Sequence, residues 1–160
     1  MIKAEIIARR IDSVYEVSVD LGQYNPSLKW DTGAKFTVIS ARMLDDDVSD
    51  NVLIELKAYC EKHQKRKEKF ISASGDPFYG YLSHAKDVVV GNTVLSDFYY
   101  YLVFENKRDI ALLGFDFIES CSGSFNAHSD IIVTEFDEEG YGSVGTALES
   151  DELIALIDSL

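Results

Sequence analysis

The sequence contains few residues of several types that would mark a specialised class of protein. Its 160 residues include only two cysteines and two prolines, so no disulfide framework is expected and the composition is that of an ordinary globular domain. No apolar run approaches the roughly 20 residues of a membrane-spanning helix. The segment Met1–Glu5 also lacks the apolar core of a signal peptide. We therefore expect one cytoplasmic domain with reduced thiols and no membrane contact.

Basic residues are missing from the last third of the chain. The last of them is Arg108, and residues 109–160 hold 12 of the 28 acidic residues that give a net charge of −13. Nucleic acid is not expected as a partner, because phosphate binding requires an exposed positive surface. One local exception is a basic cluster, which we interpret as the solvated C-terminal end of a helix. It consists of Lys62, Lys65, Arg66, Lys67 and Lys69.

Most of the chain has the patterns of β-strands. Residues 14–21 alternate between apolar and polar side chains, which predicts a half-buried strand, and residues 36–39 are β-branched and aromatic. Gly91-Asn92, between two valine-containing runs, predicts a two-residue hairpin turn. The continuous apolar run 98–104 is typical of a strand buried on both faces. Further strands are expected near 124–127 and 130–136, so the fold class is mainly β.

Two segments have helical spacing instead. Residues 50–69 place apolar side chains on one face after a possible cap at Ser49 or Asp50. A second helix is expected at about 147–159, after a glycine-containing linker at 140–145, because Thr146 and Glu149 match a capping box. Its apolar face predicts that it docks on the body of its own or a partner subunit, with its acids near the basic cluster.

The motif Asp31-Thr32-Gly33-Ala34 carries the most specific chemistry, and three further features support it. A second motif, Leu112-Leu113-Gly114 followed by Phe115-Asp116-Phe117, lies downstream and consists of two apolar residues and a glycine that open a short helix. Strands are expected on both sides of the first motif. A hairpin at about 71–82 with Gly75 near its tip lies between the two motifs. On these residues the chain resembles the retropepsin-like aspartic proteases, the family of the retroviral protease, over roughly residues 12–120.

The resemblance implies a closed, orthogonal β-barrel of the acid-protease type. Residues 1–136 would form the protease domain, with a helical insertion at about 41–69 and a flap at about 71–82, and residues 137–160 an acidic linker and C-terminal helix. The sequence departs from the family pattern at Lys29-Trp30, where two apolar residues are usual. Its predicted flap also differs, because it is not glycine-rich. The chain also continues for about 40 residues beyond Ser120.

The resemblance also implies a function for Asp31. Only one Asp-Thr-Gly motif occurs, so two copies of the chain would form a two-fold dimer and activate water between two Asp31 carboxylates to cleave a peptide or protein substrate. No cofactor or metal is implied. The alternative is a catalytically silent dimerisation or peptide-binding module. Supporting roles would fall to the active-site loop residues Thr32, Gly33, Ala34 and Gly114, and substrate contacts to the flap residues Ala73, Ser74 and Gly75.

Other groupings have plainer interpretations. Cys60 and His63 lie one turn apart, but two ligands fall short of a zinc site, and a half-buried helix face is expected. The run 45–47 of three aspartates is expected to be a solvated helix end rather than a calcium site. His84 and His128 lack an accompanying nucleophile elbow and are expected to be isolated surface or turn histidines.

Overall fold

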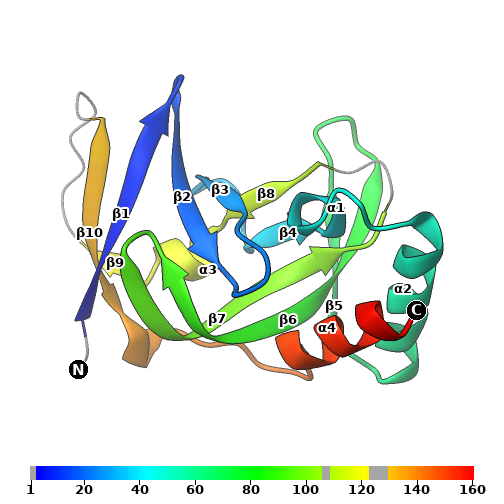
Figure 1. Cartoon of the computed structure of the whole chain (residues 1–160). Helices are drawn as coiled ribbons and strands as arrows, with labels where there is room; N and C mark the ends of the chain where they lie inside the picture. The colour runs from blue at the N-terminus through cyan, green and yellow to red at the C-terminus, as the bar shows by residue number, and fades with distance from the viewer. Residues whose placement is uncertain (1–2, 106–108, 123–129) are drawn as a thin grey trace.

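The computed structural model describes residues 3–105, 109–122 and 130–160, and most of these form strands (Figure 1). The strands are β1 (Lys3–Ile11), β2 (Val14–Asp20), β3 (Ser27–Trp30), β4 (Val38–Ser40), β5 (Lys67–Ile71), β6 (Pro77–Val90), β7 (Thr93–Val103), β8 (Ala111–Leu113), β9 (Cys121–Ser122), β10 (Ile131–Asp137) and β11 (Leu148–Glu149). The helices are α1 (Ala41–Leu44), α2 (Asp50–Lys62), α3 (Phe115–Ile118), the 3₁₀ turn η1 (Glu138–Gly140) and α4 (Ser150–Ser159). In these ranges no helix is long and apolar enough to cross a bilayer.

Six strands close into a barrel. Their order is β6-β7-β4-β8-β3-β2, and β2 pairs back with β6 at Val19↔Val90. The long hairpin of β6 and β7 turns at Gly91-Asn92, where Gly91 has a φ of +61° that a glycine adopts without strain. The predicted mainly β, closed-barrel fold and this hairpin are therefore confirmed.

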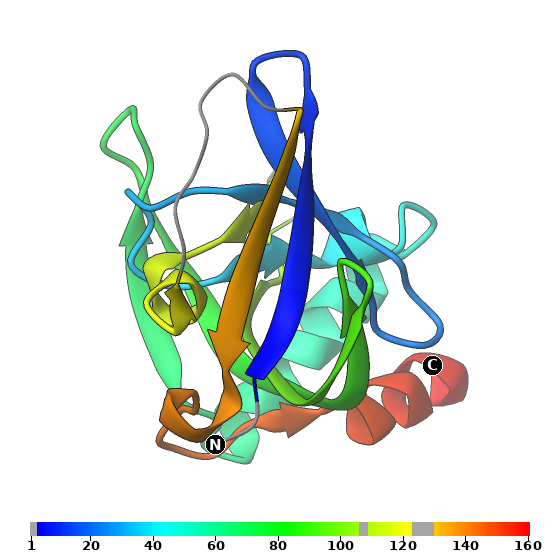
Figure 2. The same ribbon diagram turned by 90° about the vertical axis from the view of Figure 1, so that its left-hand side faces the viewer.

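Beyond β2, three further strands extend the sheet, while β5 and β11 pair with β6. β1 pairs with the end of β2 and, over its length, with β10, and β10 in turn pairs with β9. Figure 2 shows β1 and β10 side by side across the face of the molecule. The sequence patterns do not predict β1, although Ile6 and Ala8 are buried while Glu5 and Arg9 are exposed. The strand predicted near 130–136 is confirmed as β10, whereas 124–127 and His128 lie outside the described residues.

The core fills the barrel from both faces of β7. Phe98, Tyr100 and Leu102 belong to the main cluster, and Tyr101 and Val103 to a second cluster beneath the β5–β6 hairpin. All five are at most 1% exposed. The expected strand with two buried faces is therefore confirmed, and its aromatic side chains join the two clusters.

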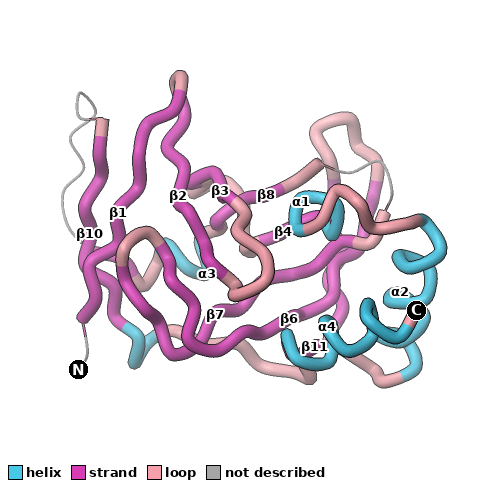
Figure 3. The backbone as a smooth tube through the Cα atoms, viewed as in Figure 1, coloured by secondary structure: helices cyan, strands magenta, loops and turns pink. Residues whose placement is uncertain are grey.

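Three of the helices, α1, α2 and α4, lie near one another at one end of the barrel (Figure 3). The cap predicted at Ser49 is present, because the Ser49 hydroxyl accepts from the Val52 amide at 3.3 Å. The predicted helix end at 69 is wrong: α2 ends at Lys62, and the chain turns at Gln64, whose φ is +53°. Lys67 and Lys69 alternate with Glu68 and Phe70 in β5, so the basic cluster is mainly a turn and a strand.

The C-terminal helix begins later than predicted. Residues 148–149 form β11, which pairs in parallel with β6, and α4 starts at Ser150. The capping box is therefore built by Glu149 and Glu152 rather than by Thr146 and Glu149, and the Glu152 carboxylate accepts from the Glu149 amide at 3.2 Å. The physical reason is that Leu148, which is 1% exposed, is held extended in the sheet by the core.

Candidate active site

Asp31 directly follows β3 at the point where three barrel strands meet. β8 lies between β3, which is parallel to it, and β4, which is antiparallel. The Asp31 amide continues this pairing by donating to the Leu113 carbonyl oxygen at 3.0 Å. The strand alternation also explains the Lys29-Trp30 departure, because Leu28 is fully buried while Lys29 points outward. The sheet therefore fixes where the Asp31 backbone leaves the barrel.

The loop after Asp31 wraps around its carboxylate. The Gly33 amide donates to Asp31 Oδ1 at 2.9 Å, and the Ala34 amide donates to the Asp31 carbonyl oxygen at 3.3 Å. A Cβ atom at Gly33 would lie 3.2 Å from Asp31 Oδ1, closer than almost all such contacts. Asp31 is half-buried, whereas Thr32 and Gly33 are exposed. The carboxylate is thus held at the surface of the barrel by a backbone donor.

Gly114 lies against the far side of this loop. A Cβ atom there would be 2.3 Å from the carbonyl carbon of Phe36 and 2.4 Å from its oxygen, so the two backbones can pass only because Gly114 has no side chain. The next residue, Phe115, donates its amide to the Ala34 carbonyl oxygen at 2.7 Å. The second motif therefore packs directly behind Asp31-Thr32-Gly33-Ala34.

The buried Thr37 and the half-buried Asp116 tie the two motifs together. Asp116 Oδ1 accepts from the Thr37 amide at 2.9 Å and from the Thr37 hydroxyl at 2.7 Å. The Thr37 hydroxyl oxygen in turn accepts from the Gly114 amide at 3.1 Å. Burial raises the pKa of the Asp116 carboxyl, although hydrogen bonds from Thr37 and Phe117 oppose that rise. The sequence patterns give no role to this pair, and the only signal is an acidic residue in the first turn of α3.

A pocket of about 880 Å³ opens in front of Asp31. Most of its wall is apolar, and four charged residues, Glu16, Lys29, Lys35 and Asp109, also line it. The apolar wall includes Phe36, Val38, Met43, Phe70, Ile71, Phe78, Ile110 and Leu112. A concave apolar space with a carboxylate at its wall can hold a side chain of a bound peptide near that carboxylate.

The β5–β6 hairpin covers this pocket. It pairs from Lys67↔Tyr81 to Ile71↔Pro77, so the hairpin begins four residues before the predicted 71–82. Of the predicted flap residues, Ala73 lines the pocket together with Ser72. Ser74 and Gly75 are exposed at the tip, where Gly75 has a φ of +90°. The tip is closed by its own hydrogen bonds, among them Gly75 N to Ser72 O at 2.9 Å.

The other candidate groups lie apart from this pocket. Cys60 is fully buried, and burial raises the pKa of its thiol to about 12, whereas His63 is exposed at the end of α2, so the helix-face interpretation is confirmed. Asp46 and Asp47 are exposed after α1, as expected for a helix end. In the described residues no three His, Cys, Asp or Glu side chains gather as they would around a metal ion. The interpretation of His84 as a surface histidine is wrong, because it is only 6% exposed.

Comparison with known proteins gives a result for the fold only. No family model matches the sequence, and no curated protein matches it. Solved structures do match, among them the crystal structure of a retropepsin-like aspartic protease from Rickettsia conorii, with a TM-score of 0.51 and 17% identity. That match covers 81% of this chain and 98% of the other chain. The chain has a retropepsin-like fold. At 17% identity the similarity shows the fold and not the activity.

Proposed function

We propose that this protein is a homodimeric aspartic endopeptidase. The observation that carries the proposal is the Asp31 carboxylate, which is held by the Gly33 amide at 2.9 Å and lines the pocket beneath the β5–β6 hairpin. The catalytic unit would be residues 1–136, and the substrate an extended peptide or protein segment. The retropepsin-like fold, shared with a protease of 17% identity, also supports a hydrolase.

In this mechanism two carboxylates share one proton. The ionised Asp31 of one subunit takes a proton from a water molecule whose oxygen bonds to the scissile carbonyl carbon, and the protonated Asp31 of a second copy donates to the carbonyl oxygen. The resulting diol breaks its C–N bond as one carboxyl gives its proton to the amide nitrogen and the other carboxylate takes a proton from a hydroxyl, which restores the singly protonated pair. Two carboxylates at hydrogen-bond distance cannot both be ionised, so the pair keeps one proton between them. Thr32 would contact the partner loop and keep the two carboxylates coplanar, while Gly33, Ala34 and Gly114 allow the close approach of the backbones.

The surface around the motif supports a second copy as the partner. Thr32 and Gly33 are exposed, and Phe115, whose amide bonds to Ala34, has 48% of its surface exposed. A large apolar side chain beside an exposed polar loop is typical of a surface that another protein covers. Cys60 and Cys121 are both free, which fits the reducing cytoplasm that we propose as the location.

Replacement of one carboxylate tests the proposal. Asp31→Asn should reduce peptide cleavage by about a hundredfold to ten-thousandfold, because a general acid or base typically contributes a factor of that size. Asp109→Asn is the matched control, since Asp109 lines the same pocket and has no role in the dyad. Cleavage should be measured on a peptide library at acidic and neutral pH. Equal activity of Asp31→Asn and the unmodified protein would contradict the assignment.

The mass of the active species tests the dimer separately. Activity should vary with the square of the protein concentration at high dilution, and sedimentation should give twice the chain mass of 17.9 kDa. Full activity in a monomer would contradict the dimer.

A catalytically silent peptide-binding module is the second candidate. The observation that favours it is the tip of the hairpin, where Ser72, Ser74 and Asp76 bond to one another and so have less bonding capacity left for a substrate. For such a module, a peptide would bind with equal affinity to Asp31→Asn and to the unmodified protein, and neither would cleave it.

A further inference from the structure

The C-terminal residues 141–160, here called the C-terminal strap, lie along one side of the barrel. At the start of the strap the Tyr141 hydroxyl accepts from the Tyr99 amide at 2.7 Å. Further on, the Arg66 amide donates to the Thr146 carbonyl oxygen at 2.8 Å, and Leu148 and Glu149 pair with Ser83 and His84 of β6. Figure 1 shows that α4 then lies beside α2, which it contacts.

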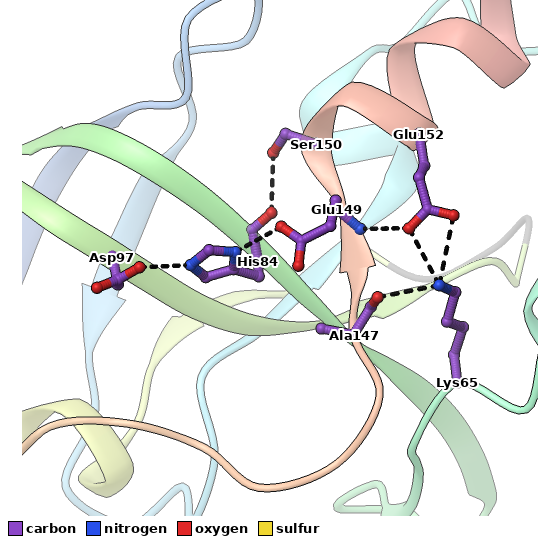
Figure 4. Close-up of polar contacts among 7 residues, drawn as sticks. All are labelled: Lys65, His84, Asp97, Ala147, Glu149, Ser150 and Glu152. Carbon is purple, nitrogen blue, oxygen red and sulfur yellow. Dashed lines mark hydrogen bonds and ion pairs between the residues drawn. The ribbon is translucent and has the colours of Figure 1, made fainter.

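Two largely buried basic side chains hold the strap (Figure 4). Lys65 has 8% of its side chain exposed, and its Nζ lies 3.0 Å from Glu152 Oε1 and donates to the Ala147 carbonyl oxygen at 3.0 Å. His84 has 7% of its side chain exposed and lies between two carboxylates. Its Nδ1 is 2.5 Å from Glu149 Oε2, and its Nε2 is 2.7 Å from Asp97 Oδ1.

The geometry of His84 favours a proton on both ring nitrogens. A neutral imidazole donates from one nitrogen only and presents a lone pair at the other. With a carboxylate oxygen at each nitrogen, the neutral ring would set that lone pair against a negative oxygen. The doubly protonated ring instead makes two charge-assisted hydrogen bonds. Both bonds, and therefore the link between Glu149 of the strap and Asp97 of β7, depend on the imidazolium.

The groups around His84 agree with a cationic ring. On β7, Asp97 bonds to the ring and the Tyr99 ring lies 4.7 Å from it, centroid to centroid. On β6, Lys86 lies opposite Asp97 in the strand register. On the strap, Glu149 bonds to the ring, and the Ser150 hydroxyl donates to the His84 carbonyl oxygen at 3.2 Å. The imidazole is therefore in contact with two carboxylates and one aromatic ring, and the one neighbouring cation, Lys86, lies opposite Asp97.

The strap also holds the base of the β5–β6 hairpin. Arg66 comes immediately before β5, and its guanidinium donates to the Val144 carbonyl oxygen at 2.5 Å and to Glu68 at 3.0 Å. The Arg66 carbonyl oxygen accepts from Leu82 in β6 at 2.8 Å. A Cβ atom at Gly145 would lie 2.8 Å from Arg66 Cδ, so strap and hairpin base are in close contact. Movement of the strap would therefore displace Arg66, where the hairpin begins.

We propose that His84 is a pH-sensitive clasp that fastens the C-terminal strap to the barrel and thereby sets the position of the hairpin over the pocket. With both ring protons present, the clasp is closed. Loss of one proton as the pH rises breaks one of the two bonds, leaves a carboxylate against a lone pair and releases the strap. Only the last step, from hairpin position to peptide turnover, rests on the proposed protease function.

Hydrogen exchange of the full chain tests the clasp without any need for catalysis. The amides of Arg66 and of residues 148–149 should lose about tenfold in protection between about pH 5 and about pH 9, a range that spans the usual titration of histidine, after correction for intrinsic exchange. His84→Gln removes the titrating group and should show weak protection that no longer varies with pH. His63→Gln is the matched control, because His63 is exposed, and it should behave as the unmodified protein does. An equal pH response in His84→Gln and the unmodified protein would overturn the proposal.

A second measurement keeps the test decisive if His84→Gln does not fold. Nitrogen NMR shifts of the His84 ring in the unmodified protein should show both nitrogens protonated at the acidic end and one at the basic end. Glu149→Gln should lower the pH at which that change occurs, because it removes one of the two negative partners. A ring that stays neutral throughout would refute the clasp. If the clasp is present and no peptide is cleaved, the proposed function fails alone.

Discussion

The two regions that flank the β5–β6 hairpin are held by different kinds of interaction. The loop of residues 31–37 is fixed to β8 and α3 mainly by backbone hydrogen bonds and by the side-chain-free crossing at Gly114. The C-terminal strap is held by the pairing of β11 with β6 and by the buried Leu148 and Leu153, and in addition by ionisable side chains, chiefly Lys65, His84 and Glu152. Backbone contacts respond little to pH and salt, whereas ion pairs respond to both. The molecule therefore combines a site of constant geometry with a support that responds to solution conditions.

The largest effect should come from a side chain at the backbone crossing. Gly114→Ala would place a methyl group 2.3 Å from the Phe36 carbonyl carbon, and because backbone atoms cannot move aside, we expect a loss of at least about 3 kcal/mol in the free energy of unfolding. Urea denaturation measures this. Gly140→Ala is the matched control, since nothing lies within 4 Å of its position. A Gly114→Ala protein as stable as the control would show that the loop is not rigid.

A smaller effect should come from the strap. Lys65→Met keeps the length of the side chain but leaves Glu152 without its cation, and we expect a loss of about 1–2 kcal/mol, since Glu152 is partly exposed and can rehydrate. Lys62→Met, on the exposed end of α2, should cost less than about 0.5 kcal/mol. A double-mutant cycle with Glu152→Gln isolates the pair. A coupling energy near zero would mean that backbone contacts alone hold the strap.

The Lys65–Glu152 pair also makes the stability of the folded protein fall at acidic pH. Burial would raise the pKa of Glu152, but hydrogen bonds from Tyr59, the Glu149 amide and Lys65 outweigh burial and lower it. A lowered pKa stabilises the folded state above the ordinary pKa of glutamate, about 4.3, and this contribution is lost as the pH falls through the folded value. Unmodified protein should therefore lose more stability on acidification below about pH 4 than Glu152→Gln does. Parallel curves for the two proteins would contradict this.

The smallest effect should come from Asp116, and it should have the opposite sign. The raised pKa of this carboxyl means that its ionisation, as the pH rises above about 4, opposes folding. Asp116→Asn keeps an oxygen for the Thr37 donors and removes the charge, so stability at neutral pH should stay within about 1 kcal/mol or rise. The fall in stability just above pH 4 should become shallower. A large loss of stability would show that the negative charge, not the oxygen, holds the two motifs together.

The features that could be predicted from the sequence are those encoded within a few residues. Apolar alternation in residues 14–21 predicted a strand that the structure contains as β2. The Gly91-Asn92 pair predicted the turn that joins β6 and β7. The Asp31 motif was recognisable because its four residues are contiguous, whereas its position beside the second motif followed only from the family resemblance, and the short strand β3 before it was not predicted. Local patterns failed for the basic cluster, where Lys67 and Lys69 follow the period of a strand once Phe70 is anchored in the aromatic cluster.

The features that could not be predicted depend on residues far apart in the chain. His84 is buried because Asp97 and Glu149, at separations of 13 and 65 residues, bring carboxylates to it. Thr37 and Asp116 meet across 79 residues. Neither partner is distinguishable from an ordinary surface residue until the barrel brings the strands together. The capping box shifted for a similar reason, since the pairing of Leu148 with Ser83 holds residues 148–149 extended.

The pairing of β1 with β10 has a consequence for synthesis of the chain. Residues 3–9 find their partners at 131–137, whereas β2 offers β1 only the pairs from Arg9↔Glu16 to Ile11↔Val14. A ribosome releases earlier residues first, so most of β1 has open hydrogen-bonding groups until residues 131–137 have emerged. Such distant pairing is slow, typically milliseconds to seconds. During that interval the growing protein exposes a strand edge that chaperones or other nascent chains can capture.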